Sequence, residues 1–125
     1  MKLILITLVG LVVGLMVACG GGGIQFAGAR DVVDSFNEFD FKDCQVMVYQ
    51  MVGAKSGLKC SVSQSEDGTV EVYTFDGNAE TLCNKNEFCQ QLDQWGGNQV
   101  YLENVMLVVY DDMDFGNALI EDLQQ

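Results

Sequence analysis

Two groups of polar side chains are spaced as the ligands of a calcium ion are spaced in proteins. Asp76, Asn78 and Glu80 alternate along the chain, and Glu87 stands at the twelfth place counted from Asp76. This spacing follows the twelve-residue EF-hand loop, whose oxygen atoms bind Ca²⁺. The sixth place is Thr81, where that loop has Gly, and a predicted strand precedes the segment instead of a helix. A turn that leads into a helix amino terminus explains the same residues equally well.

The second group is the acidic segment 111–114, in which Asp112 and Asp114 are the candidate Ca²⁺ ligands. Such a cluster could bind Ca²⁺ weakly through its carboxylates. The alternative is a solvated turn in which one aspartate caps the next helix. Calcium is the one cofactor that the sequence suggests, and both sites have this structural alternative.

The residue types of the chain give little indication of a catalytic site. The chain has no histidine, the most common general base and a frequent transition-metal ligand. No glycine-rich phosphate loop follows a predicted strand, and paired carboxylates carry no information in a chain with 18 acidic residues. Ser56 beside Lys55 and Lys59 is equally consistent with a polar turn. We therefore predict a protein that is not an enzyme and binds no nucleotide.

Three tyrosines give the best binding hypothesis from the sequence. Tyr49, Tyr73 and Tyr101 each lie in a predicted strand. Because side chains alternate between the two faces of a sheet, the three could share a face that helices leave uncovered. Exposed aromatic side chains on a sheet form a credible contact surface for a protein or a glycan.

Cys19 ends an apolar run and precedes four glycines. Sixteen residues separate it from Lys2, and Thr7 is the only polar side chain among them. As a helix the run reaches about 24 Å, which is short for a bilayer core and typical of a signal peptide. Its last residues, Met16-Val17-Ala18, resemble the lipobox of bacterial lipoprotein precursors. The resemblance implies lipid transfer to the Cys19 thiol, cleavage before it, and a stable membrane anchor of two or more acyl chains.

If Cys19 carries lipid, four cysteines remain in the exported part of the chain: Cys44, Cys60, Cys83 and Cys89. An even number of cysteines in a small exported domain indicates two disulfides, for which three connectivities exist. We favour the two pairs that are nearest in sequence. A four-thiolate metal site is the competing interpretation, but the close Cys pairs of such sites are missing from these spacings.

The charge restricts the partners. With 6 basic and 18 acidic residues the net charge is −12. A field of this sign repels nucleic acid and anionic lipid headgroups, so nucleic-acid binding is excluded and a basic protein surface is favoured. The acids are spread along an otherwise apolar chain, which indicates a folded domain with a solvated acidic surface.

The chain divides into a signal peptide over 1–18, a glycine-rich tether over 19–28 and one acidic domain over 29–125. The Asp-Gly at 67–68 between two alternating segments is a strong hairpin signal. The segment before Gln94 is expected either as one helix or as two, with Asn86 capping the second. The pattern predicts, in order, a helix over 29–37, strands over 45–52, 58–65 and 69–75, a helix ending at 94, strands over 99–102 and 105–110, and a closing helix capped by Asp112 or Asp114. This is an α+β fold with an antiparallel sheet of about five strands and helices on one face.

The half of the chain from Lys59 onward resembles the carboxyl-terminal part of small, uncharacterised bacterial lipoproteins. The residues that carry the resemblance are Thr74-Phe75-Asp76, the helix through Trp95, the hairpin 100–107 and the closing segment from Asp112 to Leu123. The resemblance concerns layout and implies no activity.

Together these observations predict a lipid-anchored extracytoplasmic protein that acts as a non-catalytic binding module of the cell envelope. The alternatives are a structural or accessory envelope lipoprotein without a defined ligand, and a Ca²⁺-binding module.

Overall fold

A computed structural model of the chain describes residues 24–125. This part contains four α-helices, five strands and two short 3₁₀ segments, η1 and η2. In chain order the elements are α1 (Ala29–Asp34), β1 (Phe41–Val46), η1 (Tyr49–Val52), β2 (Ser56–Val62), β3 (Thr69–Thr74), α2 (Ala79–Asn84), α3 (Glu87–Gln90), η2 (Leu92–Trp95), β4 (Asn98–Leu102), β5 (Val105–Val109) and α4 (Met113–Leu123).

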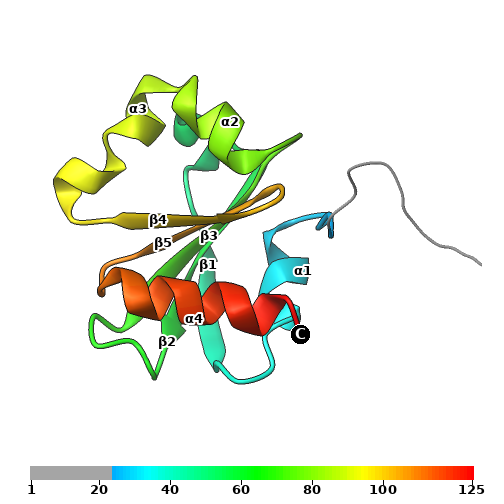
Figure 1. Cartoon of the computed structure of the whole chain (residues 1–125), viewed down its shortest axis with the longest axis vertical. Helices are drawn as coiled ribbons and strands as arrows, with labels where there is room; N and C mark the ends of the chain where they lie inside the picture. The colour runs from blue at the N-terminus through cyan, green and yellow to red at the C-terminus, as the bar shows by residue number, and fades with distance from the viewer. Residues whose placement is uncertain (1–23) are drawn as a thin grey trace, which may run out of the picture.

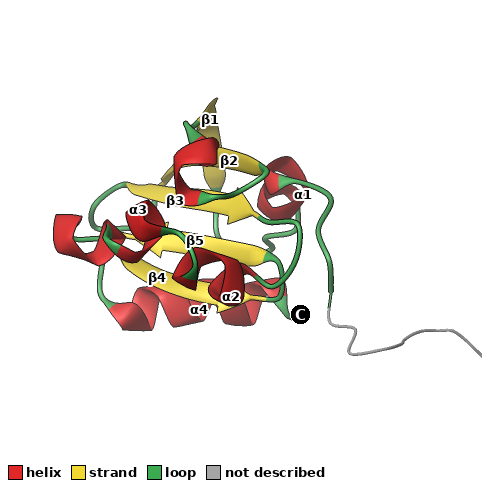
Figure 2. Ribbon diagram, turned by 90° about the horizontal axis from the view of Figure 1, so that it is seen from above, coloured by secondary structure: helices red, strands yellow, loops and turns green. Residues whose placement is uncertain are grey.

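The five strands form one antiparallel sheet in the order β1-β2-β3-β5-β4 (Figures 1 and 2). This confirms the predicted α+β class and the antiparallel sheet of five strands. The hairpin of β2 and β3 turns at Gly68, whose φ of 98° favours glycine. Every residue of β5 is buried, because β5 is flanked by β3 and β4 and is covered on both faces. Its unbroken apolar sequence is typical of such a strand.

Helices pack on both faces of the sheet, so the prediction of helices on one face is wrong. Figure 1 shows α2 and α3 on the opposite side of the sheet from α1 and α4. Two separate groups of buried side chains correspond to these layers. One joins α1 and α4 to Val70, Val72 and other residues of the sheet. The other joins η1, α2, α3 and η2 to Tyr73 and Met106.

The strand predicted over 45–52 is shorter and begins earlier than expected. β1 ends at Val46, opposite Leu58 of β2, and Tyr49–Val52 forms η1. The chain must return within a few residues to start β2, and Gly53 at φ 83° completes that return. β1 also contains an irregularity at Asp43, where the pairing with β2 shifts register and φ is 55°.

The predicted second helix is divided into α2, α3 and η2. The side chain of Asn78 accepts a hydrogen bond from the Thr81 backbone amide and caps α2. Asn86 accepts one from the Cys89 amide and caps α3, which confirms the predicted break at this residue. Between β3 and β4 the chain therefore forms two short helices and a 3₁₀ turn instead of one continuous helix.

Two disulfides join the cysteine pairs nearest in sequence, as predicted. Cys44 of β1 is bonded to Cys60 of β2, with a Cα–Cα distance of 4.0 Å. Cys83 of α2 is bonded to Cys89 of α3, at 5.3 Å. Because all four thiols are used in pairs, a four-thiolate metal site is not formed.

The domain begins before the predicted boundary at Ala29. Phe26 is buried in the group that contains α1 and α4. The buried side chain of Asn104 accepts a hydrogen bond from the Phe26 amide at 3.0 Å and donates one to the Phe26 carbonyl at 2.8 Å. The tether predicted over 19–28 is therefore fixed to the domain from Phe26 onward.

Candidate functional site: an apolar groove over a buried carboxylate

A groove of about 320 Å³ lies on the side of the sheet that carries η1, α3 and η2. Residues of β1 and η1 form one wall, residues of α3 and η2 form the other, and the sheet forms the floor. The lining residues are Val46, Met47, Val48, Met51, Val52, Glu71, Tyr73, Phe88, Leu92, Trp95 and Tyr110. The volume is at the small end of the range of ligand pockets.

The walls present apolar side chains to solvent. Val46 is 76% exposed, Val48 67%, Trp95 54% and Met51 49%. Of the six large apolar side chains that are exposed in residues 24–125, these four line the groove. The Trp95 ring also packs on Phe88, with centroids 5.0 Å apart. A concentration of exposed apolar side chains at one groove is the usual mark of a binding site.

The floor contains a buried carboxylate. Glu71 is only 5% exposed. It lies on β3 opposite Val108 of β5, and the alternation of β3 directs Glu71 and Tyr73 to the groove side. The Tyr73 hydroxyl donates a 2.7 Å hydrogen bond to Glu71 Oε1, and the Tyr110 hydroxyl donates one of the same length to Oε2.

Both phenols are held in the protonated form. Burial raises the pKa of Tyr73 and of Tyr110 well above the usual value, and the hydrogen bond and negative charge of Glu71 raise them further. They therefore remain hydrogen-bond donors at neutral pH. The carboxylate is fixed from both sides by groups that cannot compete with it for a cation.

Glu71 forms no ion pair within residues 24–125. The residues that line the groove include no Lys or Arg. Lys59 of β2 is the direct cross-strand neighbour of Glu71, but its side chain is exposed and the two form no ion pair within 4.0 Å. The two ion pairs present in residues 24–125 are Lys42 with Asp40 and Lys55 with Asp76, both elsewhere.

The three tyrosines of the predicted contact surface do not lie together on one exposed face, and Tyr73 is buried. Tyr73 lines the groove, whereas Tyr49 and Tyr101 do not. Tyr49 lies in η1, not in a strand, and both it and Tyr101 pack against the buried group beneath α2 and α3. Burial, followed by the nearby charge of Glu80, raises the pKa of Tyr101. The expectation of a sheet face free of helices is wrong, because α2, α3 and η1 cover most of it.

The residues that build the groove carry no clear signal in the sequence. The sequence pattern predicts a strand over 45–52, which contains Val46, Val48 and Met51, and gives Trp95 no role in binding. One signal could have been read: Glu71 interrupts the apolar alternation of β3 on the same face as Tyr73. A carboxylate on the inner face of a strand requires a partner that is itself close by.

The structure does not bring the EF-hand-like residues together. Asp76 is paired with Lys55 at 3.7 Å, and Asn78 caps α2. Glu80 and Glu87 are exposed in the first turns of two different helices. In the described part of the chain no three acidic or thiol side chains converge as metal ligands. These residues serve the turn and helix termini that were the alternative interpretation.

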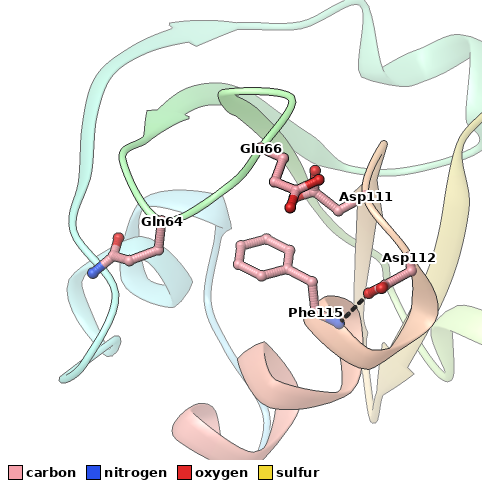
Figure 3. A pocket seen from close by; sticks show the side chains of 5 residues that line it. All are labelled: Gln64, Glu66, Asp111, Asp112 and Phe115. Carbon is pink, nitrogen blue, oxygen red and sulfur yellow. Dashed lines mark hydrogen bonds between the residues drawn. The ribbon is translucent and has the colours of Figure 1, made fainter.

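The acidic segment at 111–114 borders a smaller pocket of about 140 Å³, drawn in Figure 3. The ring of Phe115 lies among Gln64, Glu66, Asp111 and Asp112 there, and Asp114 is not a lining residue. Asp112 Oδ1 accepts a hydrogen bond from the Phe115 amide and caps α4. Asp111 Oδ1 accepts one from the Asp67 amide. The segment thus orders a turn and a helix start.

The predicted lipidation site Cys19 and the signal peptide lie outside the described residues. In residues 24–125 no helix has the length and apolar character needed to cross a bilayer. No family model, no curated protein and no solved structure matches the chain.

Proposed function

We propose that this chain is a lipid-anchored extracytoplasmic binding module without catalytic activity, and that its groove holds the apolar side chains of a partner protein. The observation that carries the proposal is the grouping of Val46, Val48, Met51 and Trp95 around one groove. Leaving such side chains in water forgoes about 1.5–3 kcal/mol for each one that a partner would bury. A structural lipoprotein with no ligand has no need to place four of them together.

The charge of the chain supports a basic partner surface. At −12 the net charge attracts basic proteins and speeds their encounter. The exposed apolar walls then provide the short-range contact, as at the centre of many protein interfaces.

The anchor is supported by the apolar leader and by the residues that resemble a lipobox before Cys19. The two disulfides agree with an oxidising compartment, where such bonds persist. Intact mass of the protein extracted from membranes tests this part directly. The expected species begins at Cys19, carries acyl groups and contains two disulfides. A full-length, unacylated polypeptide with reduced thiols would refute it.

Binding in the groove can be measured by tryptophan fluorescence, because Trp95 lines the groove and is the only tryptophan of the chain. The full protein, reconstituted in phosphatidylcholine vesicles, is titrated with the tripeptide acetyl-Leu-Lys-Leu-amide. We expect the Trp95 emission to shift to shorter wavelength and to be protected from a soluble quencher, because the peptide replaces water at the indole.

The variant Met51→Gln tests the groove by making one of its walls polar, and Met113→Gln is the control. Met113 is also exposed, but it lies at the start of α4 and not in the groove. Met51→Gln should weaken the spectral response, and Met113→Gln should leave it unchanged. An equal effect of the two substitutions, or no response of Trp95 in the unsubstituted protein, would contradict the proposed function.

A further inference from the structure

We propose that the groove selects a lysine or arginine side chain of the partner, with the aliphatic stem between the apolar walls and the cation on Glu71. This inference rests on the proposed function, because it assigns the partner side chain that occupies the same groove. It adds the chemistry by which one protein segment is preferred over another.

The first step concerns the cost of the buried charge. A carboxylate taken out of water is expensive unless it is paired with a cation and hydrogen-bonded. Glu71 is buried and accepts two hydrogen bonds, yet no cation of the described chain lies within 4.0 Å of it. The carboxylate of the groove floor therefore forms no ion pair with a side chain of residues 24–125.

The second step concerns hydrogen-bonding capacity. An ionised carboxylate offers about four lone-pair positions. Tyr73 uses one on Oε1 and Tyr110 uses one on Oε2, and no other hydrogen bond to Glu71 is formed within residues 24–125. One position on each oxygen is thus left for a donor that enters through the groove. An ammonium or guanidinium group can supply such donors.

The third step concerns the path to the carboxylate. Met51, Leu92 and Trp95 are lining residues on the two walls above Glu71. Lysine and arginine bury their methylene stems on apolar surface while the charged end reaches a polar group. Aromatic faces attract the same cations, and Phe88, Tyr73 and Tyr110 belong to the lining as well. A purely apolar side chain would contact the walls but would leave Glu71 without a cation.

Within residues 24–125, Lys59 is the basic side chain nearest to Glu71 along the sheet and could compete for it. It is the cross-strand neighbour of Glu71, and it lines a separate pocket next to Asp43. Because its side chain is exposed and unpaired with Glu71, it leaves the groove accessible to a cation from outside. Lys59→Met is therefore expected to leave the preference for a cationic peptide in place.

The test uses three peptides of the form acetyl-Leu-X-Leu-amide, in which X is lysine, Nε-acetyl-lysine or norleucine. Each is titrated into the full protein in phosphatidylcholine vesicles, and Trp95 emission reports binding. We expect the lysine peptide to bind about 10- to 100-fold more tightly than either neutral peptide, the range of a hydrogen bond to a charged group. This comparison requires no variant to fold.

Glu71→Gln and Glu121→Gln separate the local effect from the overall charge. Both remove one negative charge, but Glu121 is exposed on α4, on the opposite side of the sheet. Glu71→Gln should remove the preference for lysine and keep the binding of the norleucine peptide. Glu121→Gln should retain the preference.

The outcomes distinguish this inference from the proposed function. If all three peptides bind equally and Met51→Gln weakens all of them, the groove binds apolar side chains and the selection of a cation is refuted. If the lysine preference survives Glu71→Gln, long-range attraction explains it and the inference is again refuted. If no peptide changes Trp95 emission, the proposed function itself fails.

Discussion

Asn104 provides the sharpest test of how the domain holds the segment that leads toward the predicted anchor. It is 2% exposed, and its side chain makes both hydrogen bonds to the Phe26 backbone and a third, at 3.4 Å, to the Phe75 carbonyl. The substitution Asn104→Ala removes all three contacts and keeps the backbone of the β4–β5 turn. Two polar groups of Phe26 are then left without partners in the interior.

The cost can be estimated in two ways that agree. If Phe26 stays in place, each unpaired buried group costs about 1–3 kcal/mol. If Phe26 moves out to water, its groups are solvated but about 1.5–3 kcal/mol of side-chain burial is lost, in addition to the hydrogen bonds. The chain takes the cheaper alternative, so we expect Asn104→Ala to lower the free energy of unfolding by about 2–4 kcal/mol. This is a large part of the roughly 5–15 kcal/mol that a domain possesses.

Urea unfolding followed by Trp95 fluorescence, with the disulfides intact, measures the effect. With a slope of about 2 kcal/mol per molar, the middle of the range for small proteins, the midpoint should fall by about 1–2 M. Asn117→Ala is the control, because Asn117 is exposed on α4. An Asn104→Ala midpoint equal to that of Asn117→Ala would refute the role given to the Phe26 contacts. Hydrogen exchange at the Phe26 amide should increase in Asn104→Ala alone.

Three further predictions concern the disulfides, the helix cap and the buried tyrosines. Replacing Cys44 and Cys60 together by Ala should cost about 3 kcal/mol, the chain-entropy value for a loop of this length, and a loss below about 1 kcal/mol in urea unfolding would contradict it. Asp112→Ala should cost about 1 kcal/mol through loss of the α4 cap, whereas Asp112→Asn should retain most of it in thermal unfolding. Because the pKa values of Tyr73 and Tyr110 are raised in the folded state, the unfolded chain loses these protons first as pH rises. Their contribution to stability is therefore complete below pH 10.0 and declines above it. Urea midpoints should begin to fall near pH 10.0 and continue to fall as the pH rises further, and they should fall less steeply in the double Tyr→Phe variant. Equal slopes in the two proteins would contradict this assignment.

The parts of the fold that depend on local patterns could be predicted from the sequence. The Asp-Gly turn at 67–68, the apolar β5 and the cap at Asn86 each follow from residues close together in the chain. The same is true of the disulfides, which join neighbouring cysteines. Helices on both faces of the sheet could also have been predicted from β3, which carries apolar residues on both faces. Val72 and Tyr73 point to opposite faces, and each needs a layer that covers it.

The candidate site could not be predicted in the same way. Its two walls are separated by about forty residues, and each wall is a short 3₁₀ turn with its flanking residues. Such short turns show no apolar periodicity in the sequence. Their position in space depends on where the neighbouring strands end. Only Glu71, a charge within an apolar strand, pointed to the floor of the groove.

The pairing of the cysteines has a consequence for biosynthesis. Cys44 meets Cys60 and Cys83 meets Cys89, so neither bond spans a cysteine of the other pair. As the polypeptide is released amino terminus first, the earlier pair can be oxidised before the later one has emerged. Acylation of Cys19, as proposed, would also withdraw the fifth sulfur from exchange. The arrangement allows correct oxidation without an isomerase to sort mixed partners.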